Sequence, residues 1–161
     1  MNAWLALAAM VATGTTAVVY CNFSFRVMPR LAALAPADGI LRMQGFNRNA
    51  VRPPFMAAFF GAALLSVLLA VRAVTAGPGT AAPVPGALLV GGAVLYLAGF
   101  VLTVVYHVPR NESLARLDPR AAGAVPVWRA YLREWTRANT VRAVLSTGSA
   151  AVFCAAAVLS A

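Results

Sequence analysis

The chain has 161 residues, of which 61% are hydrophobic, and it carries a formal net charge of +9. A water-soluble domain of this size could not bury so much apolar surface, so an ordinary soluble fold is excluded. All the basic residues are arginines, and almost all lie in two short segments between hydrophobic stretches. This is the pattern of membrane topology, so we expect an integral protein of the lipid bilayer that binds no nucleic acid.

Four hydrophobic stretches are long enough to cross about 30 Å of hydrocarbon at about 1.5 Å per residue. Only helices satisfy all their own backbone hydrogen bonds in lipid without closing into a barrel. The predicted fold is therefore all-α, a single four-transmembrane-helix bundle domain over residues 1–161. The predicted spans are residues 3–25, 54–75, 86–107 and 141–161.

The connections between the spans carry further signals. Apolar residues at helical spacing predict a short amphipathic helix within residues 36–51. A second amphipathic helix is expected to begin near Pro126 and to continue into the fourth span. The uncharged segment AGPGTAAPVPG between the second and third spans predicts a short turn. By the positive-inside rule the arginine-rich connections are cytoplasmic and both termini are outside. Small residues spaced by four, including Gly61 and Gly91, predict close helix packing.

The third span ends in the sequence LYLAGFVLTVVYHVPRN, which contains the single histidine of the chain. Tyr96, Gly99, Thr103 and His107 follow one another at spacings of three, four and four, so they share one helical face. A polar stripe on an apolar span is expected to face protein or a water-filled pocket. We therefore expect a site at the end of this span.

Polar residues on the other spans can join this site. On the fourth span one face carries Trp135, Asn139, Arg142, Ser146 and Ser149. Arg142 is either an interfacial anchor or a fixed cation for an anionic substrate or intermediate, because an unpaired arginine at this depth is costly. Tyr20 and Asn22 lie at the same depth on the first span. Asn47 either closes the pocket from below or lies in a solvated loop.

Three interpretations of His107 remain open. It can be an interfacial side chain, or a general base kept neutral by burial and by Arg142. It can also be a metal ligand, with Glu112 as the nearest candidate partner, but no second histidine is present. Glu112 can instead orient His107, pair with an arginine, or form the first turn of a cytoplasmic helix with Asn111 as its cap. We expect no metal site.

Four segments resemble the DUF1772 or anthrone-oxygenase-like membrane family, and the resemblance covers nearly the whole chain. They are FSFRVMPRL, NRNAVRPPFM, YHVPRNESL and WTRANTVRA. The resemblance implies a four-helix membrane protein related to fungal enzymes that oxidise anthrones to anthraquinones. Most bacterial members have no assigned reaction. The composition, rich in Ala, Arg, Val and Gly, is typical of a GC-rich genome, and the inner membrane of a bacterium is the expected location.

The resulting hypothesis is a membrane-embedded oxygenase of small apolar aromatic metabolites. His107 removes a proton, Arg142 with Asn111 or Asn139 holds the resulting oxyanion, and the carbanion reacts directly with O2 as co-substrate without a bound cofactor. The expected substrate-binding residues are Trp135, Tyr20, Tyr96, Thr103, Asn22 and Asn47. Two alternatives are a metal- or haem-dependent membrane oxidase of another small metabolite and a non-catalytic membrane subunit or carrier. Any of these can form a homo-oligomer.

Overall fold

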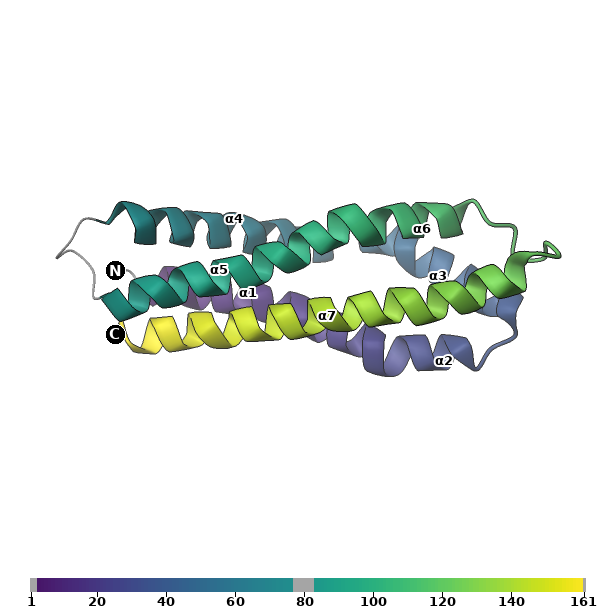
Figure 1. Cartoon of the computed structure of the whole chain (residues 1–161), viewed down its shortest axis with the longest axis horizontal. Helices are drawn as coiled ribbons and strands as arrows, with labels where there is room; N and C mark the ends of the chain where they lie inside the picture. The colour runs from purple at the N-terminus through teal and green to yellow at the C-terminus, as the bar shows by residue number, and fades with distance from the viewer. Residues whose placement is uncertain (1–2, 77–82, 161) are drawn as a thin grey trace.

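The computed structural model describes residues 3–76 and 83–160, and within them the chain is helical, with no strand. The predicted all-α fold class is confirmed. In chain order the elements are α1 (Ala3–Asn22), η1 (Phe23–Val27), α2 (Met28–Ala32), α3 (Pro36–Ala50), α4 (Phe55–Thr75), α5 (Pro83–Leu102), η2 (Thr103–His107), α6 (Val108–Ala115) and α7 (Ala124–Val158). The elements η1 and η2 are short π-helical segments, and Figure 1 shows how the helices lie along one common direction.

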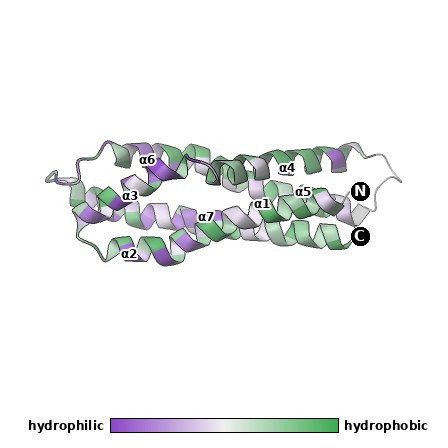
Figure 2. Ribbon diagram, turned by 180° about the vertical axis from the view of Figure 1, so that it is seen from behind, coloured by the Kyte–Doolittle hydropathy of each residue, from purple (hydrophilic) through white to green (hydrophobic). Residues whose placement is uncertain are grey.

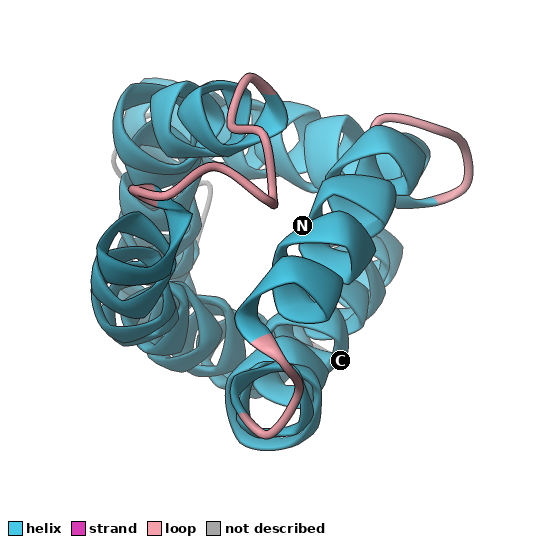
Figure 3. Cartoon of the chain, turned by 90° about the vertical axis from the view of Figure 1, so that its right-hand side faces the viewer, coloured by secondary structure: helices cyan, strands magenta, loops and turns pink. Residues whose placement is uncertain are grey.

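Four of the described helices are long and apolar enough to cross a membrane, so the chain is an integral membrane protein. Each packs against two neighbours: α1 lies against α7 and α4, and α5 lies against the same two helices. The end-on view in Figure 3 shows the helices arranged around a common centre line. This closed arrangement turns one face of every helix inward.

The first and third predicted spans lie within helices that continue beyond them. The first helix runs without interruption to Ala32 and the third to Ala115, whereas the sequence predicted ends at Phe25 and His107. Prolines cause the difference, because a proline inside a helix normally ends or kinks it. Here a π-helical segment precedes each proline and lets the helix continue.

The expected amphipathic helices are both present. Helix α3 occupies residues 36–50, and α7 begins at Ala124 and continues unbroken through the fourth span. The predicted turn between the second and third spans lies largely at residues 77–82, outside the described residues. The proposed packing role of Gly61 and Gly91 is wrong, because no atom lies within 4 Å of where their Cβ would stand.

The bundle has two chemically different ends. We call the end formed by α2, α3, α6 and the first half of α7 the arginine-rich end. At the opposite end α1 begins and α7 finishes, and the surface there is mostly apolar, with Arg72 on α4 as a basic exception. Figure 2 shows the hydrophilic residues concentrated at the arginine-rich end.

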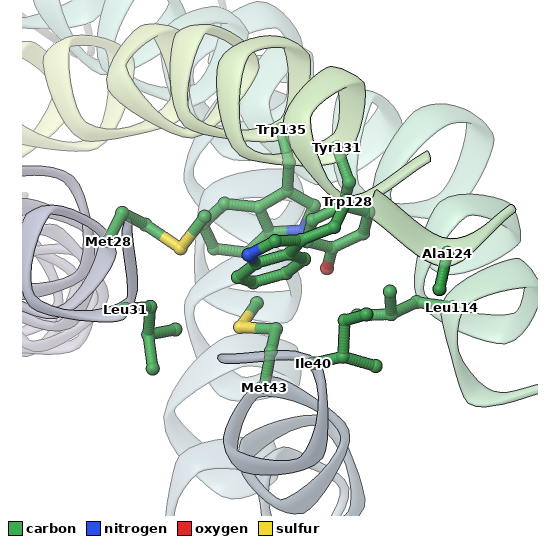
Figure 4. Packing of buried hydrophobic residues seen from close by; sticks show 9 residues of the cluster. All are labelled: Met28, Leu31, Ile40, Met43, Leu114, Ala124, Trp128, Tyr131 and Trp135. Atoms are coloured by element: carbon green, nitrogen blue, oxygen red, sulfur yellow. The ribbon is translucent and has the colours of Figure 1, made fainter. Parts of the chain in front are cut away.

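Each end has its own core. The membrane core consists mainly of small and aliphatic side chains: Ala6, Ala9, Leu69, Leu89, Ala93, Phe153, Ala156 and Ala157. The aromatic core, at the arginine-rich end, consists of Met28, Leu31, Ile40, Met43, Leu114, Ala124, Trp128, Tyr131 and Trp135. Its three aromatic rings stack along α7, with ring centroids 5.7 Å apart for Trp128 and Tyr131 and 6.1 Å apart for Tyr131 and Trp135. Figure 4 shows the α3 side chains of Ile40 and Met43 beside them.

Candidate functional site

The site is built on the two π-helical segments, which lie within the first and third long helices beside α7. In each, a backbone N–H bonds a carbonyl five residues earlier, from Met28 to Phe23 and from Val108 to Thr103. The residue after each of these donors is a proline, which has no N–H of its own to donate. Turns of this kind are frequent at functional sites. Here they carry Ser24 and His107, both buried.

A layer of polar side chains separates the two cores. It gathers residues from α1, η1, η2 and α7, and we call it the polar layer: Tyr20, Ser24, Thr103, His107, Asn139 and Arg142. The sequence predicted all of these for the site except Ser24. Their side chains point into the bundle because each lies on the inward face of its helix.

Arg142 is the only charged side chain in the polar layer, and its residue is 5% exposed. Its Nη1 donates to Thr103 Oγ1 at 3.1 Å, and its Nη2 donates to Asn139 Oδ1 at 2.6 Å. The guanidinium carbon lies 4.3 Å from the centroid of the Tyr20 ring and 5.6 Å from that of the Trp135 ring. Its buried Nε has no hydrogen-bond partner. The interfacial interpretation of Arg142 is therefore wrong.

No carboxylate of the described chain lies within 4.0 Å of Arg142. Glu134 pairs with Arg110 at 2.9 Å and Glu112 approaches Arg116 at 3.9 Å, while Asp38 and Asp118 are exposed. The positive charge is thus met only by neutral oxygens and aromatic faces. A buried cation in this condition favours an anionic oxygen beside it, because none of its neighbours carries a formal negative charge.

Asn139 holds this arginine in place. Its Nδ2 donates to the Tyr20 carbonyl at 2.8 Å and to Ser24 Oγ at 2.7 Å, while its Oδ1 accepts from Arg142. Ser24 Oγ also lies 3.0 Å from Thr140 Oγ1 on α7. The amide of Asn139 is fully engaged, so it joins α1 to α7 and orients Arg142.

His107 is 1% exposed, and neither of its ring nitrogens has a hydrogen-bond partner. Its ring meets the Trp135 ring edge-to-face, with centroids 5.1 Å apart. A buried polar atom without a partner requires an explanation, and a proton-transfer role is one. The interfacial interpretation of His107 does not fit this burial.

Asn111 fixes the aromatic neighbour of His107. Its Oδ1 accepts from the Tyr131 hydroxyl at 2.8 Å and from Trp135 Nε1 at 2.9 Å. The prediction that Asn111 caps a new helix is wrong, because α6 continues directly from η2 and Asn111 lies inside it. Glu112 is exposed and faces Arg116 rather than His107. Among the described residues, no group of three or more His, Cys, Asp or Glu side chains could hold a metal ion.

The remaining predicted residues lie in different surroundings. The Tyr96 hydroxyl donates to the Phe59 carbonyl at 2.8 Å, so it ties α5 to α4. Asn47, near the end of α3, is partly buried, and its Nδ2 has no partner.

Asn22 is exposed, so the prediction that it joins the site is wrong. It lies only two residues after the inward-facing Tyr20, on a different face of α1. Asn22 instead lines a hollow of about 600 Å³ between α1 and α7. None of His107, Asn111, Asn139 and Arg142 lines this hollow, which therefore is not the pocket that the sequence predicted around them.

The sequence contains a further signal, which points to the π-helical segments. Thr13, Thr16, Tyr20 and Ser24 have the same spacing of three, four and four as the stripe that ends at His107. Each stripe is followed within six residues by a proline and an arginine, at Pro29-Arg30 and Pro109-Arg110. Two successive steps of four exceed the α-helical period of 3.6 residues, so with the following proline they indicate a widened turn near Ser24 and His107.

A family model described as Anthrone oxygenase matches residues 55–152. The chain belongs to the anthrone oxygenase family. The matched segment begins at the first residue of α4 and includes Thr103, His107, Asn139 and Arg142, whereas Tyr20 and Ser24 lie before it. Comparison with curated proteins and with solved structures gave no match.

Proposed function

We propose that this member of the anthrone oxygenase family oxidises a small apolar aromatic metabolite of the anthrone type to its quinone. One observation carries the proposal. A buried arginine without a carboxylate partner lies in the same layer as a buried histidine without a hydrogen-bond partner, and Trp135 contacts both. A cation and a free base at one aromatic surface are the two groups that enolisation of an aromatic ketone requires.

In the proposed reaction the His107 imidazole accepts a proton from the CH2 group opposite the ketone. The electron pair moves to the ketone oxygen, which becomes a phenolate-like anion beside Arg142. The ring carbon then bonds to O2 and forms a hydroperoxide after protonation. Loss of water from the C–H and O–OH groups leaves a second carbonyl. Overall, one CH2 and one O2 give one C=O and one H2O, so the reaction balances without another reductant.

The surrounding residues would act by positioning. Asn139 and Thr103 fix the guanidinium, and Asn111 fixes the indole of Trp135 through its Nε1. The Trp135 and Tyr20 rings, each 4% exposed, would form apolar walls beside a flat substrate. Because the layer is buried, the interaction between the guanidinium and an oxyanion is stronger than it would be in water.

The membrane setting fits such a substrate, since a flat apolar molecule partitions into the bilayer. We further propose that the arginine-rich end faces the cytoplasm, because positively charged segments are retained on that side. This orientation would place the polar layer nearer the inner leaflet, with both termini on the outer side of a bacterial inner membrane.

The test uses the full chain in lipid nanodiscs, with anthrone as the substrate and absorbance of the anthraquinone as the readout. We expect the protein to accelerate oxidation over empty discs and to place one ¹⁸O atom from ¹⁸O2 in the product. His107→Ala should lower kcat by about 10²–10⁴-fold, because the general base is lost. Arg142→Gln should lower it by about 10²–10³-fold, because oxyanion stabilisation is lost. The matched control is Arg129→Gln, at an exposed arginine of the same helix.

Circular dichroism and thermal unfolding of each variant would show that the bundle is intact. Equal rates with loaded and empty discs would refute the proposed reaction. Activity that survives both His107→Ala and Arg142→Gln would show that the polar layer is not the active site. Activity that requires a metal or haem, detected by elemental analysis and absorption spectra of the purified discs, would favour the alternative oxidase.

A further inference from the structure

A second feature of the molecule is the hollow of about 600 Å³ on the outer surface between α1 and α7. Its wall is formed by small or apolar residues: Gly14, Ala17, Val18, Cys21, Phe25, Thr147 and Ala150. Val18 and Thr147 are exposed, so the hollow opens away from the bundle axis. In an integral membrane protein that surface faces lipid, and we call the hollow the lipid-facing groove.

The groove becomes polar toward the arginine-rich end, where Asn22 and Arg26 complete its lining. Both residues are exposed. Arg30 lies one helical turn beyond Arg26 and on the same face. The groove is therefore apolar along the membrane-spanning part of α1 and cationic at the arginine-rich end.

The α7 side of the groove has the same polarity. Thr147 lies seven residues after Thr140, which contacts Ser24 of η1, so both residues face the first helix. Continuing back along that face leads to Arg137 and Arg133, which are exposed. Arginines of α7 and of the first helix therefore lie toward the same end of the bundle as the polar end of the groove.

The charge at this end is not neutralised by the described part of the chain. The ion pairs there use Arg110 and Arg116, which belong to α6 and its end. None of Arg26, Arg30, Arg133 and Arg137 lies within 4.0 Å of a described carboxylate. An anion supplied from outside would complement this end of the groove.

We propose that the lipid-facing groove binds one anionic phospholipid from the leaflet at the arginine-rich end. Its acyl chain lies along the wall from Gly14 to Cys21, and its phosphate lies at Asn22 and Arg26. Basic pockets between transmembrane helices are suited to anionic headgroups. A second copy of the chain is a poorer occupant, because two copies inserted the same way would bring their arginine clusters together.

Native mass spectrometry of the full chain in detergent tests this proposal. The probes are phosphatidylglycerol and phosphatidylcholine with identical acyl chains. We expect one phosphatidylglycerol to bind at least about fivefold more tightly than phosphatidylcholine, which is the contribution of one arginine at a membrane surface. Arg26→Gln should reduce phosphatidylglycerol binding about fivefold and leave phosphatidylcholine binding unchanged. Arg72→Gln, at the opposite end of the bundle, is the matched control and should change neither.

A second pair of variants tests the apolar part. Val18→Trp should fill the groove and weaken binding of both lipids. Val11→Trp, at an exposed residue of the same helix outside the lining, should not. Equal affinity for the two lipids, or equal behaviour of Arg26→Gln and Arg72→Gln, would overturn the proposal. Dimers that carry no lipid and that Val18→Trp dissociates would show instead that the groove is an interface between copies.

Discussion

The membrane core and the aromatic core hold the two ends of the bundle together in different ways. In the membrane core, alanines and a few larger side chains such as Phe153 bring helices close together. Lipid tails are as apolar as these side chains, so close contact rather than expulsion of water stabilises this region. In the aromatic core, large rings fill the space between helices, and α3 covers them. There the ordinary hydrophobic effect can act, because that end carries the charged surface.

The two cores nevertheless share one packing feature, a glycine that faces an aromatic ring. A Cβ on Gly92 would stand 2.9 Å from Phe153 Cε1, and one on Gly39 would stand 2.9 Å from Trp128 Cζ2. In both places the missing side chain lets a ring lie against a helix backbone. The two cores therefore differ in the side chains around this contact, which are small and aliphatic in the membrane core and large and aromatic in the aromatic core. Three substitutions test this difference.

The largest effect is expected from Trp128→Ala in the aromatic core. The substitution removes a ring that is 2% exposed and leaves a cavity beneath α3, which should cost about 3–5 kcal/mol of unfolding free energy. The measurement is detergent-induced unfolding followed by near-ultraviolet circular dichroism. Trp4→Ala is the control, because Trp4 is 80% exposed. If Trp128→Ala and Trp4→Ala unfold at the same midpoint, the aromatic core does not stabilise the arginine-rich end.

An intermediate effect is expected in the membrane core, where adding atoms should be harmful. Gly92→Ala pushes a methyl group into the Phe153 ring and should destabilise the bundle by about 1–3 kcal/mol. Gly91→Ala places the same methyl group in open space and should stabilise the helix by about 0.5–1 kcal/mol. The same unfolding assay compares the two variants. Changes of the same sign would show that close packing at Gly92 is not what holds α5 to α7.

The smallest effect is expected from Ser149→Ala. Its hydroxyl donates to the Gly92 carbonyl at 2.8 Å and is a buried hydrogen bond between α7 and α5. Hydrogen bonds between membrane helices contribute about 0.6 kcal/mol on average, so the unfolding free energy should fall by about that amount. Thr15→Val is the control, because the Thr15 hydroxyl bonds only to its own helix. A loss several times larger would mean that polar contacts, and not close packing, dominate the membrane core.

Much of the fold could be predicted because a lipid bilayer permits few backbone structures to cross it. Hydropathy alone located four helices, and apolar spacing located α3. The helix ends were harder to predict, since Pro29 and Pro109 are ordinary helix-ending signals. Whether a proline ends a helix or only widens a turn depends on the packing around it, and here α2 and α6 both pack against α3.

The sequence predicted which residues belong to the site better than it predicted the role of each residue. Spacing placed Thr103 and His107 on one face and Asn139 and Arg142 on another, and the structure brings these faces together. Spacing could not show that Asn139 is fully engaged with its neighbours, or that the Tyr96 hydroxyl is used by the Phe59 carbonyl. Such pairings depend on rotamers and on the distance between helices, which a linear pattern does not contain.

The unbroken course of α7 has a practical consequence. Its 35 residues extend about 50 Å at about 1.5 Å per residue, whereas the hydrocarbon core is about 30 Å thick. About 20 Å of this rigid helix therefore extends beyond the lipid tails at the arginine-rich end. An antibody fragment raised against the exposed face of this segment would bind a rigid epitope that lies outside the lipid or detergent.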